Sequence, residues 1–285
     1  TLIATDAQQH FTRHPLYITT PVVGTDKSVV EIQAELGCYL RVNSLKMNTT
    51  IIAQNGDTVY NKTKDIPFNR GQKVNEHKVD SITLEQPRLW SCEDPHLYKA
   101  VVTMYRPDGT VADQVSSNFG IRSIEYSPKF GFKLNGKKVI FKGIANHHTL
   151  GALGAAVYPR AIEKRIQLLK EFGFNHIRTA HNPYSKSFLD LCDKYGMLVV
   201  DELYDKWLTK FAGGRVEWTN LWQHDVPEFI RQDRNHPSVV MWSLGNEAGH
   251  GENFMKSYEM VKQMDPSRPV QYERAEGGPG TDIAC

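Results

Sequence analysis

An apolar run in the second half of the chain ends in an amide and a carboxyl side chain. Residues 239–241 (VVM) follow Pro237 and are typical of a strand that is buried on both faces. Asn246 and Glu247 stand after the turn residue Gly245. In a sheet of βα units, side chains at the carboxyl end of a strand are the ones that reach a substrate. There the amide can bond a hydroxyl group and the carboxyl can protonate a glycosidic oxygen, so this pair predicts sugar chemistry.

Three other apolar runs end in polar groups as well. The first ends at residues 146–148 (NHH), the second at 178–182 (RTAHN), and the third at Asp201 and Glu202. One such ending would be weak evidence. Four of them in one alternating pattern favour a polar site at a common edge of the sheet.

Two other kinds of chemistry fit these residues less well. Histidines and carboxyl groups invite a metal centre, but no H-x-x-x-H or H-E-x-x-H pattern places two of these ligands on one helix face. Arg178 would also oppose a bound cation. No G-x-S-x-G elbow is present for a serine nucleophile. We therefore expect neither a metal nor another cofactor.

Strands and helices alternate through the second half of the chain. Strands are expected at residues 139–143, 175–179 and 197–202, from 238, at 269–273, and from 281. Helices are expected at 159–172, from Ser185 to Gly196, near Pro227 at a helix start, and through Phe254 and Val261. This order predicts a parallel sheet. A doubly wound sheet stays open beside a βα-barrel, although no Gly-rich phosphate turn follows the first strand.

Alternating patterns in the first half of the chain predict a β-sandwich. Apolar side chains recur at every second position in 30–36 and 45–51, and turns are indicated at 55–57 and 107–109. About seven short strands fit an immunoglobulin-like sandwich, without the Cys…Trp…Cys spacing that would fix its type. We expect no chemistry in this half.

The bulk composition limits the class of protein but names no partner. Apolar residues make up 40% and charged residues 23% of the 285 positions, as in globular proteins. With a net charge of +2 and no basic cluster among aromatics, we expect no nucleic acid partner, and no apolar run is long enough for a membrane helix. The four cysteines lie far apart and indicate neither a zinc site nor a disulfide framework. Thr1 starts the chain in mid-pattern, so localisation cannot be read from this terminus. The sequence does not indicate an oligomeric state.

The segment at residues 242–251 (WSLGNEAGHG) resembles the acid/base segment of glycoside hydrolase family 2, and is most similar to that of its β-galactosidases. Related segments of that family correspond to residues 146–151 (NHHTLG), 177–183 (IRTAHNP), 201–202 (DE) and 265–273 (DPSRPVQYE). The resemblance implies a multidomain β plus α/β protein. Its parts would be the tail of a jelly-roll sugar-binding domain at 1–15, an immunoglobulin-like β-sandwich at 16–122, and an incomplete (β/α)8 TIM barrel at 123–285 with strands one to about six.

The resemblance also implies a function and roles for individual residues. The function would be that of a retaining exo-β-glycosidase acting on terminal β-galactosides, with Glu247 as the general acid/base. Asn246 would bond the sugar 2-hydroxyl, His147 and His181 would stabilise the transition state, and Arg178 would hold the carboxylate of the nucleophile. The other expected substrate-binding residues are Asn182, His148 and Glu202.

Two departures from the family pattern carry expectations of their own. Bacterial β-galactosidases of the family bind magnesium through a Glu-x-His after the third strand, where this chain has Lys206 and Leu208. Asp205 or Glu202 could replace them, but we expect no cation there. The family's nucleophile lies on the seventh strand and the chain stops in the sixth, so we expect an internal fragment that is inactive alone. A β-glucuronidase or β-mannosidase of the same family, or a non-catalytic carbohydrate-binding fragment, remain the alternatives.

Overall fold

The chain folds into two compact units. The first comprises Thr1–Trp90 and His96–Ser123, and the second Ser91–Pro95 and Ile124–Cys285. The computed structural model describes residues 9–38, 43–67, 74–205, 215–247, 251–275 and 277–283. Within these ranges, no helix has both the length and the apolar character that a membrane span requires.

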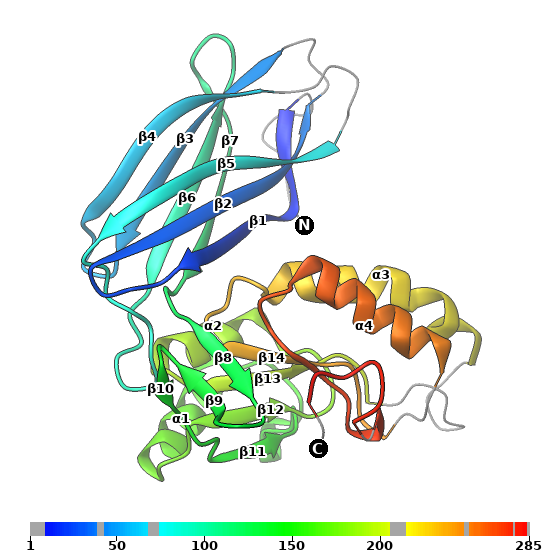
Figure 1. Ribbon diagram of the computed structural model, residues 1–285. Coiled ribbons are helices and arrows are strands. Elements are labelled where there is room, and N and C mark those ends of the chain that lie inside the picture. Colours follow the sequence, from blue (N-terminus) through cyan, green and yellow to red (C-terminus); the bar gives the residue numbers. More distant parts are fainter. Residues whose placement is uncertain are drawn as a thin grey trace. The chain divides into compact units, whose positions relative to one another are not determined.

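The first unit is a β-sandwich of two antiparallel sheets, with strand orders β1-β2-β5 and β4-β3-β6-β7 (Figure 1). Its strands are β1 Gln9–Val22, β2 Lys27–Cys38, β3 Ser44–Ala53, β4 Thr58–Pro67, β5 Val74–Glu85, β6 Tyr98–Tyr105 and β7 Val111–Phe119. Side chains alternate between the core and the outside, so that Leu45, Met47 and Ile51 of β3 are buried while Lys46 is exposed. The predicted sandwich is confirmed.

Strand β1 crosses the domain boundary that we expected between residues 15 and 16. Its first residues pair with β2, from Gln9 opposite Cys38 to Phe11 opposite Leu36, and the pairing resumes at Leu16 after an irregularity. The Phe11 backbone N–H also donates to Asp113 Oδ2 at 3.0 Å. Residues 9–15 are therefore part of this sandwich, because their backbone bonds are made within it.

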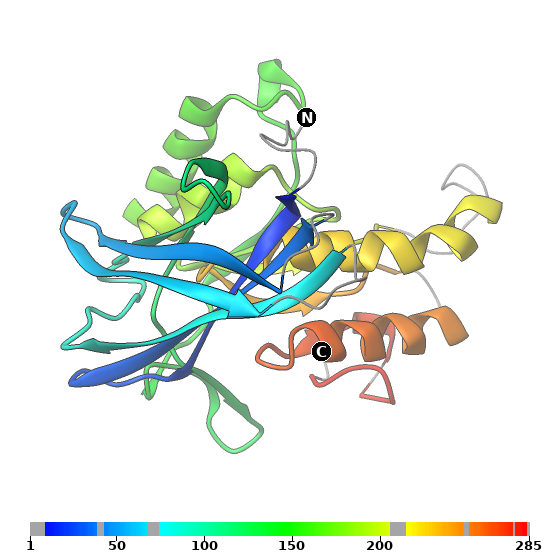
Figure 2. The same ribbon diagram turned by 90° about the horizontal axis from the view of Figure 1, so that it is seen from above.

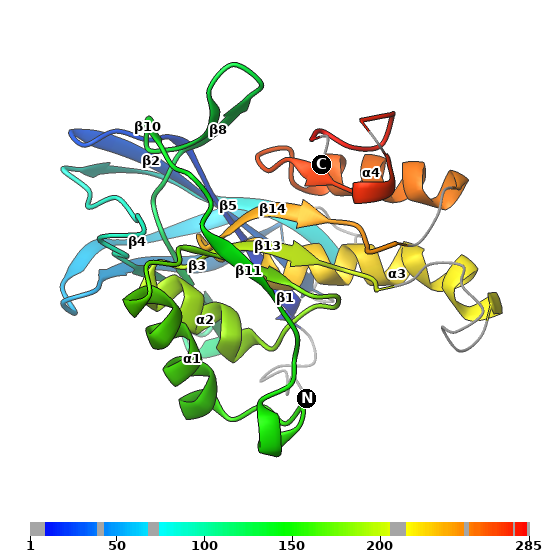
Figure 3. The same ribbon diagram turned by 90° about the horizontal axis from the view of Figure 1, so that it is seen from below.

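The second unit contains a parallel sheet whose strands follow one another in chain order, β11-β12-β13-β14-β15 (Figure 3). The strands are β11 Gly143–Asn146, β12 His176–Thr179, β13 Leu198–Glu202, β14 Val239–Ser243 and β15 Val270–Gln271. Ile283 adds a parallel bridge to Gln271, where a sixth strand was expected to begin. A doubly wound sheet reverses its strand order and this sheet does not, so the arrangement is that of part of a barrel.

Helices connect these strands. They are α1 Pro159–Glu171, α2 Lys186–Tyr195, α3 Arg215–Asp233 and α4 Glu252–Met264, with short 3₁₀ turns η1 Gly151–Leu153 and η2 Glu273–Ala275. Helices α3 and α4 lie side by side (Figures 1 and 2). The predicted ends of α2 are confirmed, since Ser185 Oγ accepts from Phe188 N–H and Gly196 takes the left-handed conformation at φ 66°.

Strand β11 begins later than the sequence predicted. Residues 139–142 (VIFK) are not in a strand, and the Phe141 ring stacks on the His176 ring with centroids 4.6 Å apart. Pairing starts at Gly143, where a Cβ atom would lie only 2.5 Å from the His176 backbone oxygen. This close approach requires glycine, so the strand starts where the chain can come near β12. A hairpin of β8 Ile124–Ser127, β9 Gly131–Leu134 and β10 Lys137–Lys138 precedes it.

Helix α3 begins well before Pro227, where the sequence predicted a helix start. Pro227 lies inside the helix, although proline lacks the N–H that the helical ladder would use. The helix continues because one of its faces is packed: Val226 and Ile230 are fully buried in the hydrophobic core of this unit. Tertiary packing therefore outweighs the local signal.

Candidate functional site

The strand ends bring polar side chains to one edge of the parallel sheet. The register places Asn146 of β11 beside Thr179 of β12, and Glu202 of β13 beside Ser243 of β14. Ser243 is in turn beside Gln271 of β15. All five strands point the same way, so the residues that follow them also lie at this edge.

Glu202 is fully buried at the centre of this edge. Its Oε2 atom accepts hydrogen bonds from Arg178 Nε (2.9 Å), Arg178 Nη2 (2.7 Å) and Ser243 Oγ (2.6 Å). Its Oε1 atom lies 2.6 Å from His181 Nδ1. We predicted that Glu202 binds sugar, but the structure differs, because both oxygens already have partners and neither faces solvent.

Asn246 is buried beside this ion pair. Its Oδ1 atom accepts from Arg178 Nη2 at 3.2 Å, and its Nδ2 atom donates to Asp205 Oδ1 at 3.3 Å. Its backbone N–H donates to the Tyr204 carbonyl at 2.9 Å. Both the oxygen and the nitrogen of the Asn246 amide are therefore hydrogen-bonded. Asp205, which the sequence suggested only as a cation ligand, instead acts on the orientation of Asn246.

Glu247 follows with an exposed side chain and an unusual backbone. Its φ angle of 40° lies in the left-handed region, which is uncommon for a residue other than glycine. Its backbone N–H donates to Glu273 Oε1 at 2.7 Å. The turn thus places an accessible carboxyl group directly after Asn246.

The histidines divide into two groups. The rings of His147 and His181 meet edge to face, with centroids 5.1 Å apart. The ring of His148 packs instead on Tyr184, at 4.2 Å between centroids, and both line a small hollow with Ile162 and other residues of the helix layer. The rings of His147 and His181 therefore lie together, whereas the ring of His148 contacts Tyr184. Asn182 is exposed beside His181.

Two residues that the sequence patterns missed hold the loop after β11. Arg165 of α1 donates to Asn146 Oδ1 (2.9 Å), to the His147 carbonyl (3.3 Å) and to the Thr149 carbonyl. Tyr184 shares hydrogen bonds with both the side chain and the carbonyl of Asn146. Burial raises the pKa of Tyr184 to about 12, although the Asn146 hydrogen bond and the Arg165 charge act against that rise. The sequence feature that could have revealed Arg165 is its positive charge next to the apolar residues on one face of α1.

Behind the edge, β13 carries a second buried carboxyl group. Asp201 accepts from Thr179 Oγ1 at 3.1 Å, and the carboxyl group of Asp233 at the end of α3 lies close enough to affect its ionisation. Burial raises the pKa of Asp201 to about 7, against the effect of the Thr179 and Asp233 hydrogen bonds and the His236 charge. Burial, then the Asp201 charge, raises the pKa of Asp233. Burial of the two neighbouring carboxyl groups thus favours their protonated forms.

Metal-ligand spacing occurs away from this edge. In the described ranges it is found at Asp190, Asp193 and His236, whose ligand atoms lie within 4.8 Å of one another. Asp190 Oδ1 accepts from Lys186 Nζ at 2.5 Å, and Asp193 bonds His236 Nδ1 at 2.6 Å. These contacts are those of an ion-pair network. Lys206 and Leu208, which stand where the resemblance would place a magnesium-binding Glu-x-His, lie outside the described residues.

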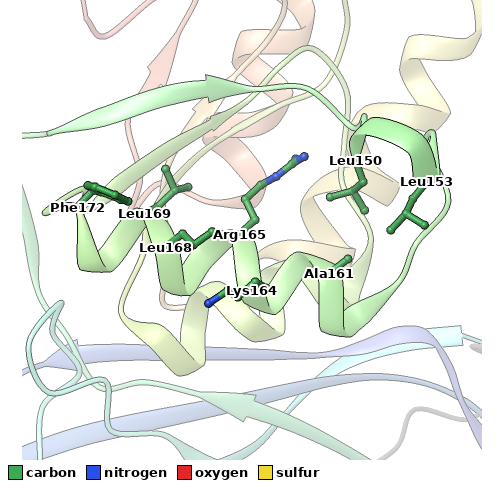
Figure 4. A pocket seen from close by; sticks show the side chains of 8 residues that line it. All are labelled: Leu150, Leu153, Ala161, Lys164, Arg165, Leu168, Leu169 and Phe172. Carbon is green, nitrogen blue, oxygen red and sulfur yellow. The ribbon is translucent and has the colours of Figure 1, made fainter.

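A hollow of about 490 Å³ lies along α1 (Figure 4). It is lined by Leu150, Leu153, Ala161, Lys164, Arg165, Leu168, Leu169 and Phe172. None of the predicted catalytic or sugar-binding residues lines it. Phe172 remains 77% exposed there, so the hollow is an open apolar surface and not the site of the expected chemistry.

Comparison with known proteins gives two family matches. Residues 129–285 match "Glycosyl hydrolases family 2, TIM barrel domain", and residues 15–122 match "Glycosyl hydrolases family 2". The β-galactosidase BoGH2A of Bacteroides ovatus is 36% identical over 235 residues, which are 81% of this chain and 27% of that protein. This chain therefore spans about a quarter of the length of that curated relative.

Solved structures show the same fold. A glycosyl hydrolase family 2 member from Bacteroides cellulosilyticus aligns with a TM-score of 0.88 and 35% identity, over 94% of this chain and 35% of that one. A β-glucuronidase from Bacteroides uniformis aligns with a TM-score of 0.79 and 26% identity, over 93% and 34%. With the sandwich, the parallel sheet and both family matches in agreement, the chain belongs to glycosyl hydrolase family 2.

Proposed function

We propose that this chain is part of a retaining exo-β-galactosidase in which Glu247 is the general acid/base. The observation that carries the proposal is the arrangement at the sheet edge. An accessible carboxyl group at Glu247 directly follows an amide at Asn246 that Arg178 and Asp205 hold in place. Relatives named β-galactosidase support the choice of sugar.

The chemistry follows from these groups. Glu247 donates its proton to the glycosidic oxygen as the leaving group departs, and then takes a proton from the attacking water. Asn246, with its plane fixed, bonds a hydroxyl group next to the reacting carbon. His147 and His181 add imidazole groups that can bond other hydroxyls of the ring. Exact placement of such groups contributes much of the rate of an enzyme.

A retaining mechanism needs a second carboxylate about 5–5.5 Å from the acid/base. Glu202 is unsuited, because it is fully buried and its oxygens accept from Arg178 and Ser243. Glu273 is committed through Oε1 to the backbone of Glu247. We propose that the nucleophile belongs to a longer chain of family length, of which these residues form about a quarter.

The charge at the edge favours a neutral sugar over a glucuronide. A glucuronide carries a carboxylate that would need a cation. In the part of this edge that the structure describes, Arg178 is already neutralised by Glu202, at 2.7 Å from Nη2 to Oε2. Because the chain is also similar to a β-glucuronidase structure, at 26% identity, a β-glucuronide is included among the substrates of the test.

The test is hydrolysis by the protein of family length. Nitrophenyl β-galactoside, β-glucuronide and β-mannoside are offered at equal concentration, and proton NMR follows the anomer that is released first. We expect cleavage of the galactoside with release of the β anomer. If the protein prefers the glucuronide or the mannoside, that sugar replaces galactose in the assignment. If it cleaves none of the three, a non-catalytic segment is the better interpretation.

A further inference from the structure

The two carboxylate oxygens of Glu202 have different hydrogen-bond partners. Oε2 receives three hydrogen bonds, two from the Arg178 guanidinium and one from the Ser243 hydroxyl. Oε1 faces His181 Nδ1 at 2.6 Å. The Glu202 side chain is fully buried, so water does not compete with these partners for its oxygens.

This arrangement fixes the proton on His181. A carboxylate paired with a guanidinium can only accept hydrogen bonds, so the Nδ1 atom that faces it must carry hydrogen. In the neutral ring, Nε2 is then unprotonated and can accept from a hydroxyl group. His181 is 18% exposed at its side chain and its ring meets that of His147, so it reaches the open side of the edge while Glu202 does not.

We propose that Glu202 is a positioning residue that sets the tautomer of His181 and the plane of Arg178, without touching the sugar. Arg178 carries the effect further, because its Nη2 atom also donates to Asn246 Oδ1 at 3.2 Å. One buried carboxylate thereby orients the imidazole and the amide on either side of it. The consequence for the reaction rests on the proposed function, whereas the tautomer itself does not.

The substitution Glu202→Gln tests this with little change of shape. Three donors surround the Oε2 position, so the amide oxygen must occupy it, and the amide NH₂ group then faces His181. Because NH₂ can only donate, Nδ1 must become the acceptor and the hydrogen must move to Nε2. The variant thus reverses the tautomer and keeps Arg178 bonded.

A matched control lies at the other end of the sheet. Asp193 Oδ2 lies 2.6 Å from His236 Nδ1, the same distance as in the Glu202–His181 pair. Asp193→Asn changes the same kind of contact at a place where no proposed site residue lies. It should alter the signals of His236 and leave those of His181 in place.

The first readout is nitrogen NMR of the 285-residue chain with labelled histidine. The eleven histidines are resolved by signal loss in His181→Asn and His236→Asn. We expect an Nδ1–H signal for His181 in the parent sequence and an Nε2–H signal in Glu202→Gln. An Nε2–H signal in the parent sequence would overturn the inference.

The second readout is kinetics of the family-length protein with its preferred glycoside. We expect Glu202→Gln to lower kcat by about 10²-fold or more at unchanged far-UV circular dichroism, and Asp193→Asn to leave it within about twofold. If Glu202→Gln does not fold, Glu202→Asp keeps the charge and the tautomer but shortens the reach, and should cost about 10-fold. Full activity in the folded Gln or Asp variant would overturn the positioning role. A parent protein that hydrolyses no glycoside would instead contradict the proposed function.

Discussion

Two carboxylate–imidazole pairs at opposite ends of the parallel sheet have the same contact distance. Glu202 and His181 lie at the carboxyl ends of β13 and β12, and Asp193 and His236 lie where β14 begins, with carboxylate-to-Nδ1 distances of 2.6 Å in both. The surroundings differ. The first pair adjoins Arg178, while Asp193 accepts from the Ser238 backbone N–H at 3.0 Å.

This difference shows that the pair itself does not indicate function. Asp193 and His236 tie helix α2 to the start of a strand, and both side chains are nearly inaccessible, at 2% and 9% exposure. The Glu202–His181 pair ends in a ring that is partly open, next to the exposed Glu247. In a barrel, the carboxyl ends of the strands carry chemistry and the amino ends carry stability. The two pairs follow that rule.

The largest effect that would test this comparison is on stability. Asp193→Ala leaves the His236 ring and the Ser238 N–H buried without their acceptor. Leaving a buried donor without its acceptor costs roughly 1–3 kcal/mol, and two donors are affected, so we expect the free energy of unfolding to fall by about 2–6 kcal/mol. Urea unfolding measures the fall, and kcat per folded molecule should stay unchanged. A lower kcat at unaltered stability would mean that the amino end also serves catalysis.

The neighbouring acids Asp201 and Asp233 sharpen the comparison through the pH dependence of stability. The pKa of Asp201 is raised by burial from its usual 3.8 to about 7, and that of Asp233 is raised as well. The folded state thus holds a proton that the unfolded chain releases. The contribution to stability is complete below about pH 4 and is lost as pH rises towards and through about 7, by a few kcal/mol.

The substitution Asp233→Asn isolates this pair. It replaces one of the two acids by a neutral amide, so Asp201 can ionise without a like charge beside it. We expect the downward slope of unfolding free energy between pH 5 and 8 to flatten in the variant. Parallel slopes in urea titrations of the two proteins would assign the pH dependence to other groups.

The smallest expected effect concerns how Glu247 is held. Glu273→Ala removes the acceptor of the Glu247 backbone N–H and frees a left-handed residue. The loss of one hydrogen bond to a charged group predicts about a 10-fold lower kcat, or roughly 1.4 kcal/mol. Glu273→Gln retains an oxygen acceptor and should keep most of the activity. Equal losses in Ala and Gln would show that the charge matters and not the hydrogen bond.

Local signals in the sequence predicted the elements whose causes are local. The expected turn at residues 55–57 joins β3 to β4, with Gly56 at a φ of 93°, and Ser185 caps α2. The alternating burial of β3 and the polar strand ends also follow from short patterns. These features depend on neighbours within a few residues.

The features that the sequence did not predict depend on contacts between distant residues. The start of β11 at Gly143 is set by the backbone of His176, and the continuity of α3 through Pro227 is set by packing. The burial of Glu202 could not be read from its place at a strand end. It follows from the meeting of Arg178, His181 and Ser243, which come from three other parts of the chain.

The central claim is that Glu247 is the proton donor of the reaction. The most direct measurement is kcat/KM of Glu247→Gln in the family-length protein, on lactose and on a dinitrophenyl β-galactoside. A dinitrophenolate leaves without protonation, whereas the sugar alcohol of lactose does not. We predict a loss on the order of 10²–10⁴-fold with lactose and a much smaller loss with the activated substrate. Equal losses on both substrates, or an unchanged rate on lactose, would contradict the assignment.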